Sequence, residues 1–320
     1  MKTEFTVFTF FKKGHIFMKR KILSSCTLFL TAIIWGYAFV AQVKGGQYLG
    51  SFTFNGIRFA LGALSLIPVI MIIEIDFSDK KKLRKTFVYS LLAGSAIFIA
   101  STLQQIGAAV TQSSGVSGFI TGIYNILTPI AYLFIFKKKT SVCVWIGSVI
   151  SIIGLFMLCM TEEGLHFGLG EISLLAGTVF WTAHILIVDR IVSEVYTLKF
   201  ACSQFLVCSI LSIISALIFE YKDFSLENVE KALIAILYCG LLSVGVAYTL
   251  QIVGQKYSAS PTAAAIILST ESVFGAIGGV QFGTDSISAL GYIGCVLIFV
   301  SIVLSQLPEG MFKRKAKKLK

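Results

Sequence analysis

Charged residues are scarce in this sequence. They make up 13% of its 320 residues, whereas a soluble domain carries about 25%. Hydrophobic residues account for 56%, and the mean hydropathy is +0.86. This composition excludes an ordinary soluble domain and predicts a protein that crosses a membrane several times, with apolar surface facing lipid.

Residues that mark catalytic and metal sites are also few. The three histidines lie far apart, and the seven cysteines are scattered through apolar runs without CxxC or metal-ligand spacing. The sequence contains no P-loop, dinucleotide-binding glycine pattern, HExxH or GxSxG motif. We therefore expect no cofactor, no metal and no enzymatic activity, because a membrane-embedded enzyme would need clustered His, Asp or Cys at one membrane face.

The net charge of +11 could indicate a nucleic-acid partner. The basic residues instead lie in short runs between apolar stretches, which is the pattern that orients membrane proteins. We expect the lipid bilayer to surround the chain and expect no nucleic acid among its partners.

Apolar runs long enough to cross a bilayer as helices follow one another along the chain, joined by short loops. They predict an all-α polytopic membrane protein with ten transmembrane helices. The runs are Ile22–Val43, Ser51–Ile73, Phe87–Ile106, Ser114–Phe136, Val142–Met160, Gly170–Val188, Phe200–Phe219, Ala232–Gly254, Pro261–Phe282 and Ile287–Gln306.

The distribution of Lys and Arg supports these boundaries. With a cytoplasmic N-terminus, 23 of the 27 basic residues fall on the cytoplasmic side and three on the other, and Arg58 alone lies inside a span. Cytoplasmic loops of membrane proteins carry such an excess. The pattern predicts cytoplasmic N- and C-termini and a location in the inner or plasma membrane.

An internal repeat divides the chain. Thr102-Leu103-Gln104-Gln105-Ile106-Gly107 resembles Thr249-Leu250-Gln251-Ile252-Val253-Gly254, shifted by 147 positions, and Trp35-Gly36 resembles Trp181-Thr182, shifted by 146. Because five spans is an odd number, the second half would enter the membrane from the opposite side. The sequence therefore predicts two inverted-topology five-helix repeats, an architecture of many secondary transporters.

The expected divisions follow from the repeat. Residues 1–21 are a basic cytoplasmic segment, residues 22–160 and 161–306 are the two repeats, and residues 307–320 are a basic tail. Met18-Lys19-Arg20-Lys21 would itself suit the start of a membrane protein, so the first 17 residues are expected to be either a dispensable extension or the result of a misassigned start.

Several stretches along the chain carry a family resemblance. They are Ile33-Ile34-Trp35-Gly36, Arg58-Phe59-Ala60-Leu61, Gly118-Phe119-Ile120-Thr121-Gly122-Ile123 with Pro129, and Gln255-Lys256-Tyr257-Ser258-Ala259-Ser260-Pro261-Thr262-Ala263-Ala264-Ala265-Ile266-Ile267-Leu268-Ser269-Thr270-Glu271. From about Leu28 to Ser305 the chain resembles the drug/metabolite transporter superfamily, EamA-type permeases. The resemblance implies ten spans, two EamA-type halves and export or exchange of small metabolites. Ser272 and Gly283-Thr284-Asp285 depart from the proline and the Gly-Glu usual there.

Glu271 is the first candidate site residue. It lies ten residues past Pro261, hence about 15 Å into a hydrocarbon layer about 30 Å thick. A carboxyl group at that depth is costly unless it faces protein or water, so it marks a functional site. It could bind a cationic group of a substrate, carry a proton, or bond structurally to a neighbouring helix.

Arg58 is the second candidate, about 10 Å deep in the second span. It could extend outward to water, pair with Glu271 at similar depth, or bind a substrate carboxylate.

The remaining candidates are uncharged at neutral pH. Trp35 and Trp181 occupy mirrored depths inside spans, away from the interfaces where Trp usually lies, so they could line a cavity or simply pack. His184 shares a helix face with Trp181 and could relay protons or be a buried structural residue. Buried amides and hydroxyls need partners, either across helices or in a substrate. Those in this group are Gln104, Gln251, Tyr248 and Asn125.

Glycine pairs suggest close helix packing, either within the chain or in a homodimer. They are Gly118 with Gly122 and Gly275 with Gly279. Taken together, the sequence predicts a secondary transporter for a small organic metabolite or amino acid, with protons as a candidate coupling ion. A channel, a scaffold and a membrane enzyme remain the alternatives.

Overall fold

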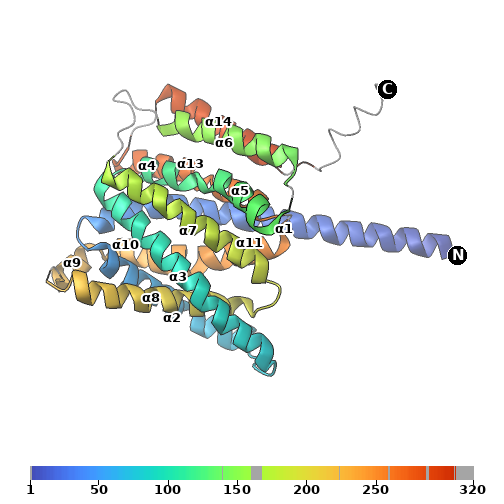
Figure 1. Cartoon of the computed structure of the whole chain (residues 1–320), viewed down its shortest axis with the longest axis horizontal. Coiled ribbons are helices and arrows are strands. Elements are labelled where there is room, and N and C mark those ends of the chain that lie inside the picture. The colour runs from blue at the N-terminus through green and yellow to red at the C-terminus, as the bar shows by residue number, and fades with distance from the viewer. Residues whose placement is uncertain are drawn as a thin grey trace.

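The computed structural model describes residues 2–138, 140–159, 168–222, 224–258, 260–285, 288–305 and 307, with side chains from residue 22 onward except 158 and 159. Within these ranges all regular secondary structure is helical, as predicted. The elements in Figure 1 are α1 (Lys2–Gly46), α2 (Ser51–Ile73), α3 (Lys80–Thr111), α4 (Ser114–Gly122), α5 (Tyr124–Phe136), α6 (Val142–Cys159), α7 (Leu169–Ile191), α8 (Thr197–Phe219), α9 (Leu226–Lys231), α10 (Leu233–Leu237), the π-helix η1 (Tyr238–Tyr248), α11 (Thr249–Tyr257), α12 (Pro261–Leu268), α13 (Glu271–Phe282) and α14 (Ala289–Ser305).

Eight helical stretches in the described part of the chain are long and apolar enough to cross a membrane. Some combine consecutive elements, such as α4 with α5 and α12 with α13. Two further apolar helices, α6 and α14, are shorter and pack along each other at one edge of the bundle (Figure 1). The ends of their expected spans, at 160, 287 and 306, lie outside the described residues. The chain is therefore a multi-pass membrane protein.

The two halves of the chain pack through matched contacts. Gly107 lies against Leu174, and Gly254 lies against Leu28, where an added Cβ would approach Leu28 Cγ to 2.7 Å. Gly254 follows Gly107 by 147 positions, and Leu174 follows Leu28 by 146. Equivalent positions of the two repeats therefore form the same contact twice. One contact lies between α3 and α7, and the other lies between α1 and α11.

Matched acidic residues cap the helices α2 and α8. Glu220, just after α8, accepts hydrogen bonds from the backbone N–H groups of Phe52 (3.0 Å) and Thr53 (2.7 Å) in the first turn of α2. Glu74, just after α2, accepts them from Leu198 (3.1 Å) and Lys199 at the start of α8. Each helix therefore ends where the other begins, so α2 and α8 run antiparallel.

Helices α4–α5 and α12–α13 are interrupted at matching places. The backbone hydrogen-bonding pattern changes at Ile123 in the first pair and at Ser269 and Thr270 in the second. At these places hydrogen bonds of the i→i+3 type replace the α-helical pattern. Their N-caps also correspond, because the hydroxyls of Ser113 and Ser260 each accept a bond from the backbone N–H three residues on. Each interruption falls in the middle of a span.

The predicted glycine contacts of these two spans are made within the chain. An added Cβ on Gly118 would lie 3.1 Å from Ser272 Cα, and one on Gly275 would lie 3.3 Å from Ser114 O. The Ser272 hydroxyl donates a 2.5 Å bond to Gly118 O. Ser272, which replaces the usual proline, therefore ties α13 to α4.

The π-helix η1 coincides with a change in the repeat. Gly94 packs on Val207 and Gly240 packs on Leu61, so these contacts correspond at a shift of 146. From Thr249 onward the shift is 147, which places one extra residue between 240 and 249. An additional residue in a helix is accommodated by i→i+5 bonding, and η1 spans Tyr238–Tyr248.

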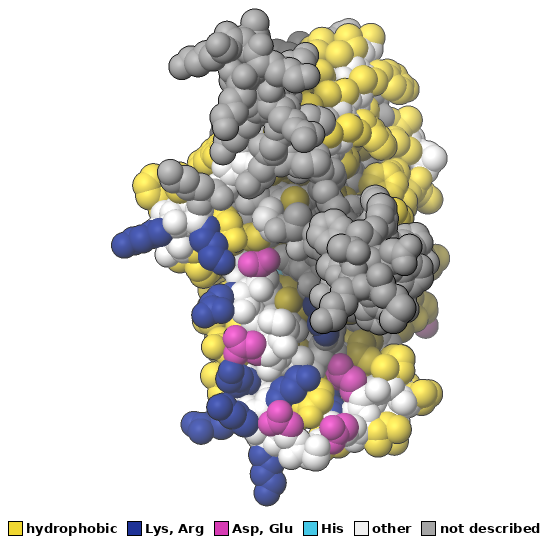
Figure 2. All heavy atoms as spheres, turned by 90° about the vertical axis from the view of Figure 1, so that its right-hand side faces the viewer, with side chains coloured by type: hydrophobic (Ala, Val, Ile, Leu, Met, Phe, Trp, Pro, Cys, Tyr) yellow, Lys and Arg dark blue, Asp and Glu magenta, His cyan; other side chains and the backbone are white. Residues whose placement is uncertain are grey.

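Charged side chains gather at the end of the molecule that faces the viewer in Figure 2. There Lys85 forms an ion pair with Glu194, and Lys199 Nζ lies 4.1 Å from the centre of the Tyr196 ring. The bonds of Lys85 hold the pKa of Glu194 below its usual range. This end carries the basic Lys80–Lys85 run, which the sequence assigns to the cytoplasmic side.

Candidate substrate pocket

A small cavity of about 40 Å³ lies at the junction of the two repeats and forms the centre of a pocket. Its position follows from the packing of α1, α3, α7 and the interrupted helices around one point. The lining side chains are Trp35, Ala38, Phe39, Gln42, Arg58, Gln104, Thr121, Tyr124, Trp181, Ile185, Ser243, Tyr248, Gln251 and Glu271. Seven of the nine residues proposed from sequence are among them.

Arg58 and Glu271 face this pocket, and each is only 3% exposed. Arg58 therefore does not extend outward to water. Its Nε donates a 2.8 Å bond to Asn55 Oδ1, and its guanidinium lies 5.0 Å from the centre of the Phe59 ring. Ion pairs among the described residues join Lys85 to Glu194 and Lys231 to Glu227, so the suggested Arg58–Glu271 pair is not formed.

Tyr124 lies beside Glu271. Each is the first residue of the helix that follows an interruption, α5 for Tyr124 and α13 for Glu271, and they are 147 positions apart. The two repeats therefore contribute an equivalent residue to the same place, a phenol from one and a carboxyl group from the other.

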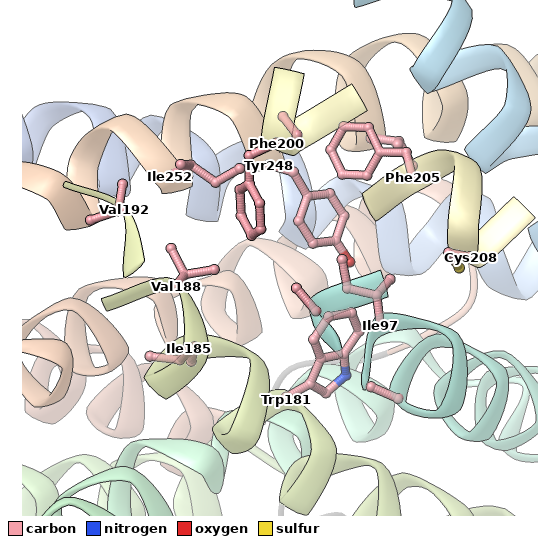
Figure 3. Close-up of a cluster of buried hydrophobic side chains, with 14 of the residues drawn as sticks. Ile97, Trp181, Ile185, Val188, Val192, Phe200, Phe205, Cys208, Tyr248 and Ile252 are labelled. Atoms are coloured by element: carbon pink, nitrogen blue, oxygen red, sulfur yellow. The ribbon is translucent and has the colours of Figure 1, made fainter. Parts of the chain in front are cut away.

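An aromatic wall is centred on Tyr248, the last residue of η1. Figure 3 shows its ring between Trp181 and Phe205, with centroids 6.1 Å and 5.5 Å away. Trp35 meets the same ring edge-on at 4.7 Å, and its Nε1 donates a bond to Ser243 O in η1. The repeat-related tryptophans thus both contact one tyrosine.

Amide side chains complete the lining. Gln104 Nε2 donates a 3.3 Å bond to Gln42 Oε1, and Gln105 Nε2 donates a 2.9 Å bond to Gln42 O, which joins α3 to α1. Gln251, the repeat counterpart of Gln104, also lines the pocket, and its Oε1 is buried without a partner.

Three buried polar atoms of the lining have no hydrogen-bond partner: Thr121 Oγ1, Trp181 Nε1 and Gln251 Oε1. Buried polar groups in folded proteins are nearly always satisfied by protein, water or ligand. Their convergence on one cavity is the arrangement of a site that binds a polar molecule.

His184 and Asn125 do not line the pocket. His184 Nε2 lies 3.2 Å from Gln204 Oε1, between α7 and α8. The Asn125 Nδ2 group donates to Ser151 Oγ (2.6 Å) and Ser269 Oγ (3.3 Å), between α5, α6 and the interruption before α13. Both residues therefore lie in helix–helix networks behind the pocket wall.

Sequence reasoning missed four polar lining residues, Gln42, Thr121, Tyr124 and Ser243. The repeat could have pointed to Tyr124, since it is the counterpart of Glu271 at a shift of 147. Ser243 accepts the hydrogen bond from Trp35 through its backbone carbonyl, and no residue pattern reveals such a contact.

The fold and the pocket define a class: a helical multi-pass membrane protein with two repeats around a buried polar site. Residues 22–160 and 168–307 each match the EamA-like transporter family, so the chain belongs to that family. It is 26% identical over 288 residues to an "Uncharacterized transporter" of Archaeoglobus fulgidus, across 90% of this chain and 87% of the relative. A crystal structure of another protein shares the fold, with a TM-score of 0.72 at 15% identity over 90% of this chain and 96% of the other. Family membership points to a membrane transporter rather than an enzyme.

Proposed function

We propose that this protein is a secondary transporter of small organic metabolites, such as amino acids or related compounds, that works by alternating access. The observation that carries the proposal is the pocket itself. It lies where the two repeats meet, beside two interrupted helices. It holds the Glu271 carboxyl group and the Arg58 guanidinium, which are not paired with each other. Secondary transporters place substrate sites at such helix interruptions near the middle of the membrane.

The proposed topology is ten spans in two inverted five-helix repeats. The reciprocal caps of α2 by Glu220 and of α8 by Glu74 support the inversion, because these helices occupy the second place in each repeat and run antiparallel. The paired helices α6 and α14 would be the fifth and tenth spans. Both termini would then lie in the cytoplasm, in an inner or plasma membrane.

Alternating access would come from rocking one repeat against the other around the pocket. The matched glycine contacts support this motion, since two similar halves can exchange equivalent arrangements. Gradients of protons or of substrate would drive transport, and Glu271 is the residue proposed to respond to protons or to cationic groups. Family resemblance favours export or exchange.

Counterflow in proteoliposomes tests the proposal. Vesicles loaded with a candidate metabolite should take up its radiolabelled form with saturable kinetics, and Glu271→Gln should reduce this uptake at least tenfold. Glu227→Gln is a matched control, because Glu227 is an exposed residue that does not line the pocket. Flux that does not saturate would indicate a channel, and no flux across a broad metabolite panel would reject transport.

A further inference from the structure

The Asp285 carboxylate joins the two repeats at one end of the molecule. It lies just after α13 and accepts hydrogen bonds from the backbone N–H groups of Ser114 (3.0 Å) and Gly115 (3.1 Å) in the first turn of α4. The Ser113 hydroxyl donates to its Oδ1 atom, and the Ser114 hydroxyl lies 2.6 Å from its Oδ2 atom. One carboxylate of the second repeat therefore holds three consecutive residues of the first repeat.

The backbones of α4 and α13 approach each other closely beside this carboxylate. Figure 1 shows the two helices side by side, and Ser114 Oγ lies 3.0 Å from Gly275 O. An added Cβ on Gly279 would lie 2.0 Å from Asp285 Oδ2, and one on Gly115 would lie 3.3 Å from Oδ1. The carboxylate reaches α4 because position 279 carries no side chain, so the contact depends on the shape of both helices.

This contact lies at the end of the molecule opposite the Lys80–Lys85 run. Helix α3 begins in that run and ends just before α4. From there α4 leads back to the pocket at Thr121, and α13 leads from the pocket at Glu271 toward Asp285 over about 18 Å. The two joined helices therefore connect the pocket to that end of the protein, one from each repeat.

The repeat does not reproduce the contact at the other end. At the shift of 147 positions Ser113 corresponds to Ser260, whereas Asp285 corresponds to Lys138 and Ser114 to Pro261. The side chain of a lysine only donates hydrogen bonds, and a proline has no backbone N–H group. Neither the acceptor nor the donor is therefore present in the equivalent positions, and the contact is built at one end only.

We infer that the bonds from the first residues of α4 to Asp285 form a gate, which closes the pocket toward the end opposite Lys80–Lys85 and breaks whenever the pocket opens there. This inference rests on the proposed alternating access and names the contact that controls it. Because the equivalent positions at the other end cannot form such bonds, the gate favours the conformation that is closed at the Asp285 end. Helix α13 connects Glu271 to the gate, so a substrate that moves Glu271 also moves Asp285.

One-sided labelling of the pocket tests the gate. Thr121→Cys places a thiol in the pocket of a protein whose seven native cysteines are replaced by serine, and a membrane-impermeant maleimide is added to right-side-out or inside-out vesicles. With Asp285 intact, we expect labelling mainly from the Lys80–Lys85 side. Asp285→Asn should raise the rate from the opposite side about tenfold or more, as for the loss of a hydrogen bond to a charged group, without raising the rate from the Lys80–Lys85 side.

Two further variants accompany Asp285→Asn, which keeps the size of the side chain and removes its charge. Ser114→Ala removes one hydroxyl group and keeps the backbone N–H bond, so it should change the labelling rate in the same direction by a smaller factor. It also serves where Asp285→Asn fails to fold. Glu227→Gln is the control, because Glu227 is an exposed carboxylate that pairs with Lys231 of its own repeat, and it should label at the native rates.

The rates from the two sides separate the possible outcomes. A general loosening of the fold would raise labelling from both sides and would contradict the gate. Native rates from both sides in Asp285→Asn and Ser114→Ala would also overturn it, and labelling of the native protein from each side would then leave alternating access standing. No labelling of Thr121→Cys from either side in any variant would reject the alternating pocket itself.

Discussion

Replacing Glu220 by alanine removes the cap at the start of α2. The Glu220 carboxylate accepts bonds from Phe52 N (3.0 Å), Thr53 N (2.7 Å) and Thr53 Oγ1 (2.7 Å). Loss of an N-cap typically costs about 0.5–2 kcal/mol, and a negative charge at a helix N-terminus contributes about 0.3–1 kcal/mol more. We therefore expect Glu220→Ala to lower the free energy of unfolding by about 2 kcal/mol.

Glu220→Gln should lower it by about half as much, because an amide oxygen can keep one of these bonds without the charge. We would measure the apparent melting temperature in detergent by cysteine accessibility or by tryptophan fluorescence. It should decrease from the native protein to Glu220→Gln and further to Glu220→Ala. Glu227→Ala, in the neighbouring short helix α9, removes a surface ion pair with Lys231 and should stay within about 0.5 kcal/mol of the native protein. If Glu220→Ala melts like Glu227→Ala, the carboxylate does not hold α2 to α8.

Three further predictions concern other parts of the fold. Ser272→Ala should lower the free energy of unfolding by about 1 kcal/mol in the same melting assay, because Gly118 O loses a buried hydrogen bond; an unchanged melting temperature would contradict the contact. Deleting Val246 removes one residue from η1, which should restore α-helical bonding as in α3 and keep the flanking residues on the same faces, so the protein should elute as a folded species with near-native transport; loss of folding or transport would show that the extra residue is required. The pKa of Glu194 lies below its usual value of 4.5 in the folded state, chiefly because Lys85 bonds to it, so its contribution to stability is present above about pH 4.5 and is lost as the pH falls through the lower folded value. The melting difference between native protein and Glu194→Gln should therefore shrink on acidification from neutral pH, and a difference that grows would refute this sign.

The class of the protein could be predicted from the sequence because it depends on one-dimensional quantities. A bilayer has a fixed thickness, so the length and apolarity of each run locate the helices. A charged residue inside an apolar run is costly whatever the position of its helix. The sequence alone therefore marks Glu271 and Arg58 as candidate site residues. The similarity between the segments at Thr102 and Thr249, 147 positions apart, also predicted that the chain consists of two repeats.

The partners of those residues were decided only by the tertiary structure. Which side chains meet across helices depends on how each helix is rotated and where it is interrupted, and both are set by packing. Arg58 therefore lies over Phe59 instead of reaching Glu271, and His184 turns to Gln204 instead of the pocket that Trp181 lines. The extra residue in η1 is accommodated by i→i+5 bonding, so that Gly254 still packs on Leu28 as Gly107 packs on Leu174, an effect of helix geometry that apolarity does not encode.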